Sequence, residues 1–224
     1  MGWADWMRAG GEVEPSLYAA DFGRLGAEID ELLAAGCRIF HFDCGDGHFV
    51  PPVTIGPVVL RSIAPAIHEA GGVLDCHLMV ADPAHHLEEF AESGADSVTF
   101  HVEAAHDPTR VAEAARAHGL AVGLAFNPET SPGEAAAAAR ASLADLVLCM
   151  GIHPGYSGQA FRPETIERVT ALARLVDVPI QVDGGVGADN VEALRDAGAT
   201  LLVAGSAVFG ADGPAVAYRR LASA

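Results

Sequence analysis

The sequence predicts an α/β fold in which eight parallel strands close into a single (β/α)₈ barrel over residues 12–224, preceded by an N-terminal extension, residues 1–11. Three observations predict this fold. A length of 224 residues with 50% hydrophobic content suits one large domain better than two small ones. Short apolar segments alternate with amphipathic segments of helical period. Glycine breaks recur where a helical segment meets the next apolar run.

Each short apolar segment is predicted to be a strand, because it is rich in Val, Ile, Leu and Ala and a helical pattern follows it. Right-handed crossovers through the helices make such strands parallel, and eight units suit a closed barrel. An open doubly wound sheet is the alternative, but no G-x-G-x-x-G follows the first strand. The strands are expected near Glu12–Leu17, Arg38–Asp43, Val73–Met79, Ser97–Val102, Ala121–Phe126, Leu146–Met150, Ile180–Val182 and Thr200–Ala204.

Helix boundaries are marked by glycine and proline. Four helices are expected to end at a left-handed glycine, namely Gly36, Gly94, Gly119 and Gly198. Three helices are expected to begin with a capping side chain before a first-turn proline, at Asp82-Pro83, Asp107-Pro108 and Ser131-Pro132. Arg162-Pro163 offers the proline without the cap.

The charge of the chain excludes several functions. The formal net charge is −17, and all 13 basic residues are Arg. Without Lys, no Schiff-base lysine mechanism is open to the protein. An acidic chain without a basic run repels nucleic acid and anionic lipid, so neither is an expected partner. An anionic ligand would therefore depend on local backbone amides.

Targeting signals and cysteine usage both indicate a cytoplasmic protein. The first residues contain no apolar run long enough for a signal peptide, and no later stretch approaches a membrane span. The four cysteines are scattered without CxxC spacing, which predicts buried thiols rather than disulfides. They are Cys37, Cys44, Cys76 and Cys149.

Polar residues collect at the predicted carboxyl ends of strands, where barrel enzymes carry their chemistry. His41 and Asp43 are two apart, so both side chains face the barrel interior while Phe40, Phe42 and Cys44 face the helices. By the same parity His77 shares its face with Asp75 and Met79. Asp183 ends its strand immediately before Gly184-Gly185.

Taken alone, a histidine at a strand end is more often a hydrogen-bonded core residue than a metal ligand. Four converging groups change that balance, because two carboxylates and two imidazoles are costly to bury unpaired. His41, Asp43, His77 and Asp183 offer two nitrogen and two oxygen ligands, which suit Zn²⁺ first and also Fe²⁺, Mn²⁺ or Co²⁺. We therefore expect one divalent metal ion as the cofactor. Other histidines, His68, His85, His86, His106 and His118, are expected to be solvated, and His48 and His101 are ambiguous.

Three glycine-containing loops are predicted on the same rim, after strands six, seven and eight. Their backbone N–H groups can converge on an oxyanion, and phosphate binding by the last two loops recurs in barrels. The sequence therefore predicts a phosphorylated ligand. The loops are Gly155-Tyr156-Ser157-Gly158, Asp183-Gly184-Gly185-Val186 and Ala204-Gly205-Ser206-Ala207.

The motifs resemble the ribulose-phosphate 3-epimerase family in order from about residue 13 to residue 210. The matching segments are PSLYAADFGRL (15–25), FHFDCGDGHFVPPVTIG (40–56), DCHLMV (75–80), HPGYSGQAF (153–161), VDGGV (182–186) and VAGSAVFG (203–210). The resemblance implies a TIM barrel and an isomerase of carbohydrate metabolism in the pentose phosphate pathway. The resemblance further implies that this enzyme would interconvert D-ribulose 5-phosphate and D-xylulose 5-phosphate with one divalent metal.

The resemblance also implies a role for individual residues. His41, Asp43, His77 and Asp183 would bind the metal, and Asp43 and Asp183 would also be the catalytic acid and base. Met79 and Met150 match the apolar floor over the metal. Substrate and phosphate would contact Ser16, His77, Met79, Met150, Gly155, Tyr156, Ser157, Gly158, Asp183, Gly184, Gly185, Val186, Gly205 and Ser206.

Two paired carboxylates fit an epimerisation, because a proton beside a ketone must be removed from one face and returned to the other. A metal would stabilise the enediolate between the two steps. A homo-oligomer is expected.

The sequence departs from the family at Gly45, where members usually have Met, at the Gly-Tyr-Ser-Gly loop and at His153. Because Gly45 would leave room, a 3-epimerase of a six-carbon, allulose 6-phosphate-like ketose is the main alternative. A lysine-dependent decarboxylase or aldolase and a non-catalytic sugar-phosphate-binding barrel have less support.

Overall fold

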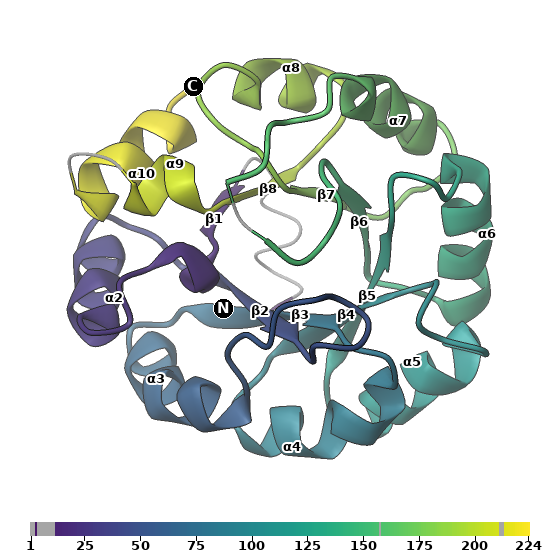
Figure 1. Cartoon of the computed structure of the whole chain (residues 1–224), viewed down its shortest axis with the longest axis horizontal. Helices are drawn as coiled ribbons and strands as arrows, with labels where there is room; N and C mark the ends of the chain where they lie inside the picture. The colour runs from purple at the N-terminus through teal and green to yellow at the C-terminus, as the bar shows by residue number, and fades with distance from the viewer. Residues whose placement is uncertain (1–2, 4–11, 157, 211–212) are drawn as a thin grey trace.

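The computed structural model describes residue 3 and residues 12–156, 158–210 and 213–224. Eight parallel strands form one sheet in the order β1-β8-β7-β6-β5-β4-β3-β2. The helices form a ring around the strands, as Figure 1 shows along the barrel axis. The predicted barrel is confirmed. The strands are β1 (Glu12–Pro15), β2 (Ile39–Gly45), β3 (Val73–Met79), β4 (Ser97–His101), β5 (Ala121–Phe126), β6 (Leu146–Met150), β7 (Ile180–Asp183) and β8 (Leu201–Ala204).

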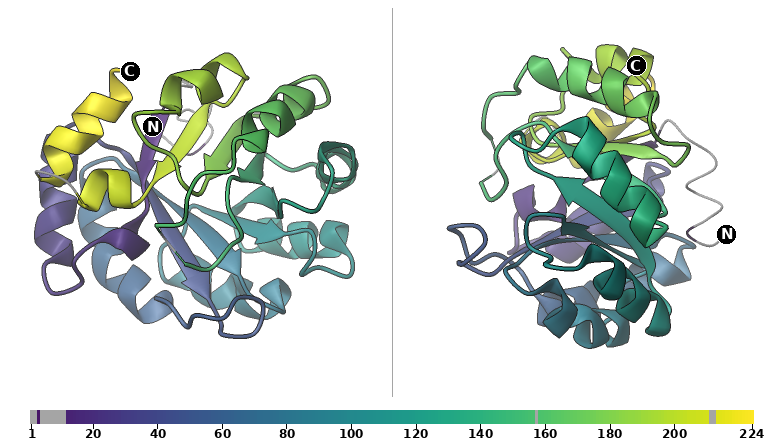
Figure 2. Two further views of the ribbon diagram at one scale, coloured as in Figure 1. Left: turned by 45° about the horizontal axis from the view of Figure 1, so that its top comes forward. Right: turned by 90° about the vertical axis from the view of Figure 1, so that its right-hand side faces the viewer.

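The connections between strands carry the helices that cover the barrel from outside, which the oblique views of Figure 2 make visible. Among the described residues the α-helices are α2 (Leu25–Ala34), α3 (Pro57–Glu69), α4 (Leu87–Glu92), α5 (Pro108–Ala117), α6 (Pro132–Ser142), α7 (Glu164–Ala173), α8 (Val191–Asp196), α9 (Ser206–Phe209) and α10 (Pro214–Ala222). Two 3₁₀ turns precede α2 and α4, η1 (Leu17–Ala19) and η2 (Pro83–His86). No helix in this part of the chain is long and apolar enough to cross a membrane.

Strand boundaries agree with the sequence to within two residues, and the largest differences are at the ends of β1 and β2. The first strand was expected to reach Leu17, but it ends at Pro15 because Leu17 opens η1. β1 pairs with β8 along its whole length, whereas the strand pairing toward β2 in the described chain is one bridge, between Ser16, just after β1, and His41. This bridge lies at the rim where the polar side chains collect. The predicted extension, residues 1–11, lies outside the described residues except for Trp3, which packs against the interior core.

Helix caps agree with the sequence at two of the three predicted sites. The Asp107 side chain accepts a hydrogen bond from the Arg110 backbone, and Ser131 forms a capping box with Glu134. At Asp82 the prediction is wrong, since its side chain caps nothing and a 3₁₀ turn follows in place of an α-helix. The four predicted helix-ending glycines do have positive φ, between 82° and 110°, at Gly36, Gly94, Gly119 and Gly198.

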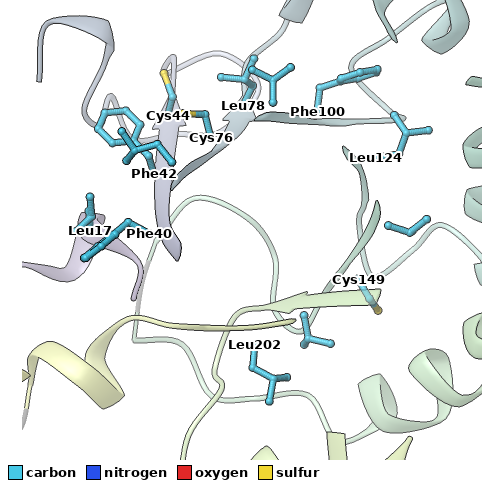
Figure 3. Close-up of a cluster of buried hydrophobic side chains, with 14 of the residues drawn as sticks. Leu17, Phe40, Phe42, Cys44, Cys76, Leu78, Phe100, Leu124, Cys149 and Leu202 are labelled. Atoms are coloured by element: carbon cyan, nitrogen blue, oxygen red, sulfur yellow. The ribbon is translucent and has the colours of Figure 1, made fainter. Parts of the chain in front are cut away.

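Two apolar layers follow from the alternation of side chains along the strands. Phe40, Phe42 and Cys44 point outward from β2 into the layer between strands and helices, together with Leu78 of β3, as Figure 3 shows. The barrel interior has a separate, smaller cluster that includes Ile39, Val73, Leu146, Leu148 and Leu201. All four cysteines are free and buried, as predicted. Apolar side chains thus fill the lower part of the barrel interior, and polar side chains occupy its rim.

Candidate active site

The four predicted metal-ligating side chains meet at the carboxyl-terminal rim of the barrel. His41 and Asp43 come from β2, His77 from the adjacent β3 and Asp183 from the end of β7. One ligand atom from each of the four lies within 4.8 Å of the others. His41 and His77 are fully buried, Asp43 is 4% exposed, and the Asp183 side chain is 16% exposed. The centre therefore opens to solvent on the Asp183 side.

The two histidines present different ring nitrogens to the centre. His41 Nε2 lies 3.3 Å from Asp43 Oδ1. His77 Nδ1 lies 3.0 Å from the same oxygen and 3.6 Å from Asp183 Oδ2. His41 Nε2 is buried and has no hydrogen-bond partner. An unpartnered imidazole nitrogen beside two carboxylates is what a site for a divalent cation requires.

Below the centre, a buried polar network holds the other nitrogen of His41. His41 Nδ1 lies 3.0 Å from Asp75 Oδ2. The Gln181 amide donates to Asp75 Oδ2 and to Glu14 Oε2, each at 2.6 Å, and the Ser97 hydroxyl donates to Asp75. Glu14, His41 and Asp75 have the residue types of a second cation site, but the Gln181 amide nitrogen already lies between the carboxylates. The network orients His41 and leaves its Nε2 free for a ligand.

The acidic and basic side chains of the centre shift one another's pKa. Burial raises the pKa of the Asp43 carboxyl, but His41 and His77 outweigh burial and hold this pKa well below its usual range. Burial lowers the pKa of both imidazoles, yet their carboxylate neighbours raise the pKa of His41 well above, and that of His77 above, its ordinary value. Asp43 is therefore ionised, and its Oδ2 accepts a 2.6 Å hydrogen bond from the Ser16 hydroxyl.

A cavity lies directly above the centre, and nearly all the predicted substrate-binding residues line it. Ser157 lies outside the described residues, and His77 is buried beneath the cavity floor rather than exposed to it. The sequence did not single out Tyr18, Ile152, Pro154, Gln159 and Val203, which also line the cavity. The predicted residues that line it are Ser16, Asp43, Met79, Met150, Gly155, Tyr156, Gly158, Asp183, Gly184, Gly185, Val186, Gly205 and Ser206.

The loop after β7 needs its two glycines. Gly184 and Gly185 have φ of 105° and 71°, which side chains rarely adopt. A Cβ on Gly185 would also lie 2.8 Å from the Phe161 backbone. In the described structure the backbone N–H groups of Gly185 and Val186 have no protein acceptor, and Ser206 stands at the first turn of α9 where its N–H has none within the helix. All three residues line the cavity, and backbone amides without an acceptor suit an anionic ligand there.

Gly45 does not enlarge the cavity. A Cβ on this residue would lie 2.8 Å from Val50 Cγ2 and 3.0 Å from the Pro52 carbonyl oxygen. The β2–α3 loop thus fills the space that the missing side chain leaves, and Gly45 is absent from the described cavity lining. The expectation that Gly45 makes room for a longer substrate is wrong for this reason.

The ambiguous histidines differ from each other. His48 is exposed, whereas His101 is fully buried at the end of β4 against His77. Burial lowers the pKa of His101 to about 4, so the ring is neutral. A signal for His101 existed in the sequence, because it lies two residues after Thr99 on the inward face of β4. His68 is 39% exposed beside Asp96, and His85, His106 and His118 are exposed as expected, while His86 is partly buried.

Fold and site together define a TIM barrel with a buried centre of two histidines and two aspartates that can hold a metal ion. A sequence model of the Ribulose-phosphate 3 epimerase family matches residues 12–209. A relative from Oryza sativa subsp. japonica, "Ribulose-phosphate 3-epimerase, cytoplasmic isoform", is 38% identical over 92% of this chain and 90% of its own length. "Ribulose-phosphate 3-epimerase" of Escherichia coli (strain K12) is 38% identical over 88% of each chain. The chain belongs to the ribulose-phosphate 3-epimerase family.

More distant solved structures share the architecture. A 3-hexulose-6-phosphate synthase superposes with a TM-score of 0.73 at 21% identity over 95% of this chain and 98% of that one. A thiamine phosphate pyrophosphorylase from Pyrococcus furiosus gives 0.67 at 17% identity over 98% and 96%. At these identities the likeness shows the fold alone.

Proposed function

We propose that this protein is a metal-dependent epimerase that inverts C3 of a ketose phosphate, interconverting D-ribulose 5-phosphate and D-xylulose 5-phosphate. One observation carries the proposal. Asp43 and Asp183, from strands on different sides of the barrel, both approach the buried Nδ1 of His77, at 3.0 and 3.6 Å, on the floor of a glycine-lined cavity. Family membership supports the same substrate.

The donor set fits one divalent transition metal. His41, Asp43, His77 and Asp183 would hold it, and the unpartnered His41 Nε2 supports this fit. Two nitrogen and two oxygen donors favour Zn²⁺, with Fe²⁺, Mn²⁺ or Co²⁺ also compatible. When bound, the ion supplies positive charge that stabilises an enediolate by several kcal/mol, on the order expected for Lewis-acid catalysis.

The protein's own groups carry the proton. Asp43 is ionised and fixed by the Ser16 hydroxyl, so it is ready to accept a proton from one face of the substrate carbon. Asp183 lies at the cavity floor on β7 and serves the other face. The two carboxylates exchange the roles of acid and base with the direction of reaction. The buried floor of Met79 and Met150 excludes water from the reacting carbon.

Phosphate recognition relies on backbone rather than on side-chain charge. The chain has no Lys, and no Arg lines the described part of the cavity. Gly185, Val186 and Ser206, whose N–H groups have no acceptor in the described loop or helix, line the cavity beside Gly155 and Gly158. Backbone amides at a loop and a helix start are a common barrel phosphate site.

The test is isotope exchange with purified protein. D-ribulose 5-phosphate incubated in deuterated water should yield D-xylulose 5-phosphate that carries deuterium at C3. A six-carbon ketose phosphate epimerised at C3 should react more slowly, because nothing at Gly45 lengthens the cavity. Absence of exchange and of product with metal-loaded protein would contradict the proposal, and faster exchange of the six-carbon sugar would redirect it.

Assembly and location are part of the proposal. Phe22, Val53 and Val58, which precede or begin α2 and α3, expose 48%, 79% and 78% of their surface, and exposed apolar side chains are suited to contact with a second copy. A homo-oligomer is expected, and light scattering coupled to size exclusion measures it. A cytoplasmic location is supported by the four free, buried thiols and by the description of the rice relative.

A further inference from the structure

The buried histidine His101, which the proposed mechanism does not use, touches the metal-ligating residue His77 edge to edge. Their Nε2 atoms are 2.8 Å apart. The ring centroids are 5.0 Å apart and the planes meet at 24°. The separation of the centroids exceeds that of the nitrogens by about two ring radii, so the nitrogens lie close to the line between the centres. This is an in-plane hydrogen bond and not a face-to-face stack.

One proton lies between these two nitrogens, and the surroundings decide which ring donates it. His77 Nδ1 faces Asp43 and Asp183 and must offer its lone pair to bind a cation. A neutral His77 with a free Nδ1 carries its proton on Nε2. His77 is then the donor, and His101 must accept through Nε2.

Acceptance by His101 requires a proton on its other nitrogen, and a carboxylate lies near that nitrogen. His101 Nδ1 lies 3.4 Å from Glu103 Oε2, close enough for the negative charge to favour a proton on Nδ1 but without hydrogen-bond geometry. The other Glu103 oxygen accepts hydrogen bonds from the Asn127 backbone, at 2.8 Å, and from the Thr130 hydroxyl. The loop after β5 therefore fixes the carboxylate. On another side Phe49 of the β2–α3 loop packs against His101, with ring centroids 4.8 Å apart.

We propose that His101 and Glu103 are positioning residues that hold His77 with its Nδ1 unprotonated and aimed at the metal. The inference rests on the proposed function, since it concerns the ion that function needs. The two metal-ligating histidines are then held differently: His41 directly by the carboxylate of Asp75, and His77 through a second imidazole to the carboxylate of Glu103. Outer partners of this kind set ligand orientation and metal affinity.

Metal affinity tests the proposal without substrate. Chelator competition with Zn²⁺ should show His101→Leu binding about 10- to 100-fold more weakly than the parent, because the acceptor for His77 is lost. His101→Gln retains an acceptor near the Nε2 position and should recover most of the affinity. His118→Leu, at an exposed histidine after α5, is the matched control and should match the parent. The Co²⁺ absorption spectrum of a variant should differ from that of the parent only when His77 no longer binds the metal in that variant.

The second readout is the tautomer of His77, from long-range ¹H–¹⁵N NMR. In the Zn²⁺-loaded parent, the proton on His77 Nε2 should give a downfield resonance that exchanges slowly with solvent. This resonance should be lost in His101→Leu and retained in His101→Gln. Glu103→Ala should weaken Zn²⁺ binding in the parent and add little in His101→Leu, because Glu103 acts on His77 only through the His101 ring. Should His101→Leu fail to fold, the Gln and Glu103 variants decide the outcome.

Parent-like Zn²⁺ affinity in both His101→Leu and Glu103→Ala, or a His77 proton on Nδ1 in the loaded parent, would overturn the proposal. So would equal loss in the Leu and Gln variants, which would indicate a packing role. Failure of the metal proposal itself looks different, because the parent would then bind no Zn²⁺ at all.

Discussion

At the scale of single residues, the proposed roles of Asp43 and Asp183 on opposite faces of the substrate make an asymmetric prediction. Asp183→Asn and Asp43→Asn should each slow epimerisation by at least about 10²-fold, the scale of a lost general acid or base. Each metal-loaded variant should still exchange the C3 proton of one epimer, and the preferred epimer should swap between the two. Isotope exchange followed separately from each sugar measures this.

Both substitutions also remove a ligand charge, so metal content must be determined on the same samples. Exchange of the same epimer by both loaded variants, or interconversion at the parent rate by either, would show that the two carboxylates do not serve opposite faces.

Gly45 gives a second residue-scale prediction, on stability. Gly45→Ala places a Cβ 2.8 Å from Val50 and should destabilise the protein by about 1–3 kcal/mol through overpacking. Gly26→Ala is the matched control, because it lies inside α2 with nothing within 4 Å of the added carbon and should stabilise by up to about 1 kcal/mol. Urea unfolding of both variants measures the difference. An unchanged urea midpoint for Gly45→Ala would contradict this prediction, because the β2–α3 loop would then accommodate the added Cβ without loss of stability.

The candidate site was only partly predictable from the sequence, and the reason is physical. His41, Asp43 and His77 share an inward face by the period of two, so strand parity alone brings them together. Their neighbours Glu14, Gln181 and His101 obey the same parity, yet their contacts depend on the stagger between strands. The closed sheet as a whole sets that stagger, so no local pattern in the sequence reveals it.

At the scale of elements, strand cores were predictable because buried apolar runs are contiguous, while the ends depended on single contacts. β2 continues past Asp43 to Gly45 because the whole segment pairs with β3, up to Met79. The missing cap at Asp82 shows the limit of an Asp-Pro signal: the turn that follows is 3₁₀, and its first N–H groups are not arranged for an α-helical cap.

This contrast between caps yields a prediction for α6. Ser131→Ala should cost about 0.5–2 kcal/mol of unfolding free energy, because Ser131 accepts from the Glu134 backbone in a capping box. Asp82→Ala should cost close to nothing, since no side-chain cap exists there. Chemical denaturation of the two variants compares them directly, and a larger loss at Asp82 than at Ser131 would contradict the assignment of the caps.

At the scale of the whole molecule, the proposed metal site would link parts of the barrel that strand pairing joins only weakly. Among the described residues, one bridge pairs the chain at β1 with β2, between Ser16 and His41, at the rim where the candidate ligands lie. The ligands come from β2, β3 and β7, and the described chain has no disulfide. An ion bound there adds a link across the rim, and its removal leaves ligand carboxylates and imidazoles in a buried space without their counter-charge.

Metal loss should therefore lower the thermal stability of the whole barrel. An ion present at about 100 times its dissociation constant stabilises the native state by about 2.7 kcal/mol, which corresponds to roughly 5–10 °C in Tm for a domain of this size. Calorimetry before and after chelation measures the shift, and restoring Zn²⁺ should reverse it. His41→Gln lacks one ligand, so its Tm should respond little to either treatment. A parent shown by elemental analysis to lose its one ion per chain on chelation, yet to keep the same Tm, would contradict this prediction, because an ion held only by the folded His41–Asp43–His77–Asp183 centre must stabilise the fold.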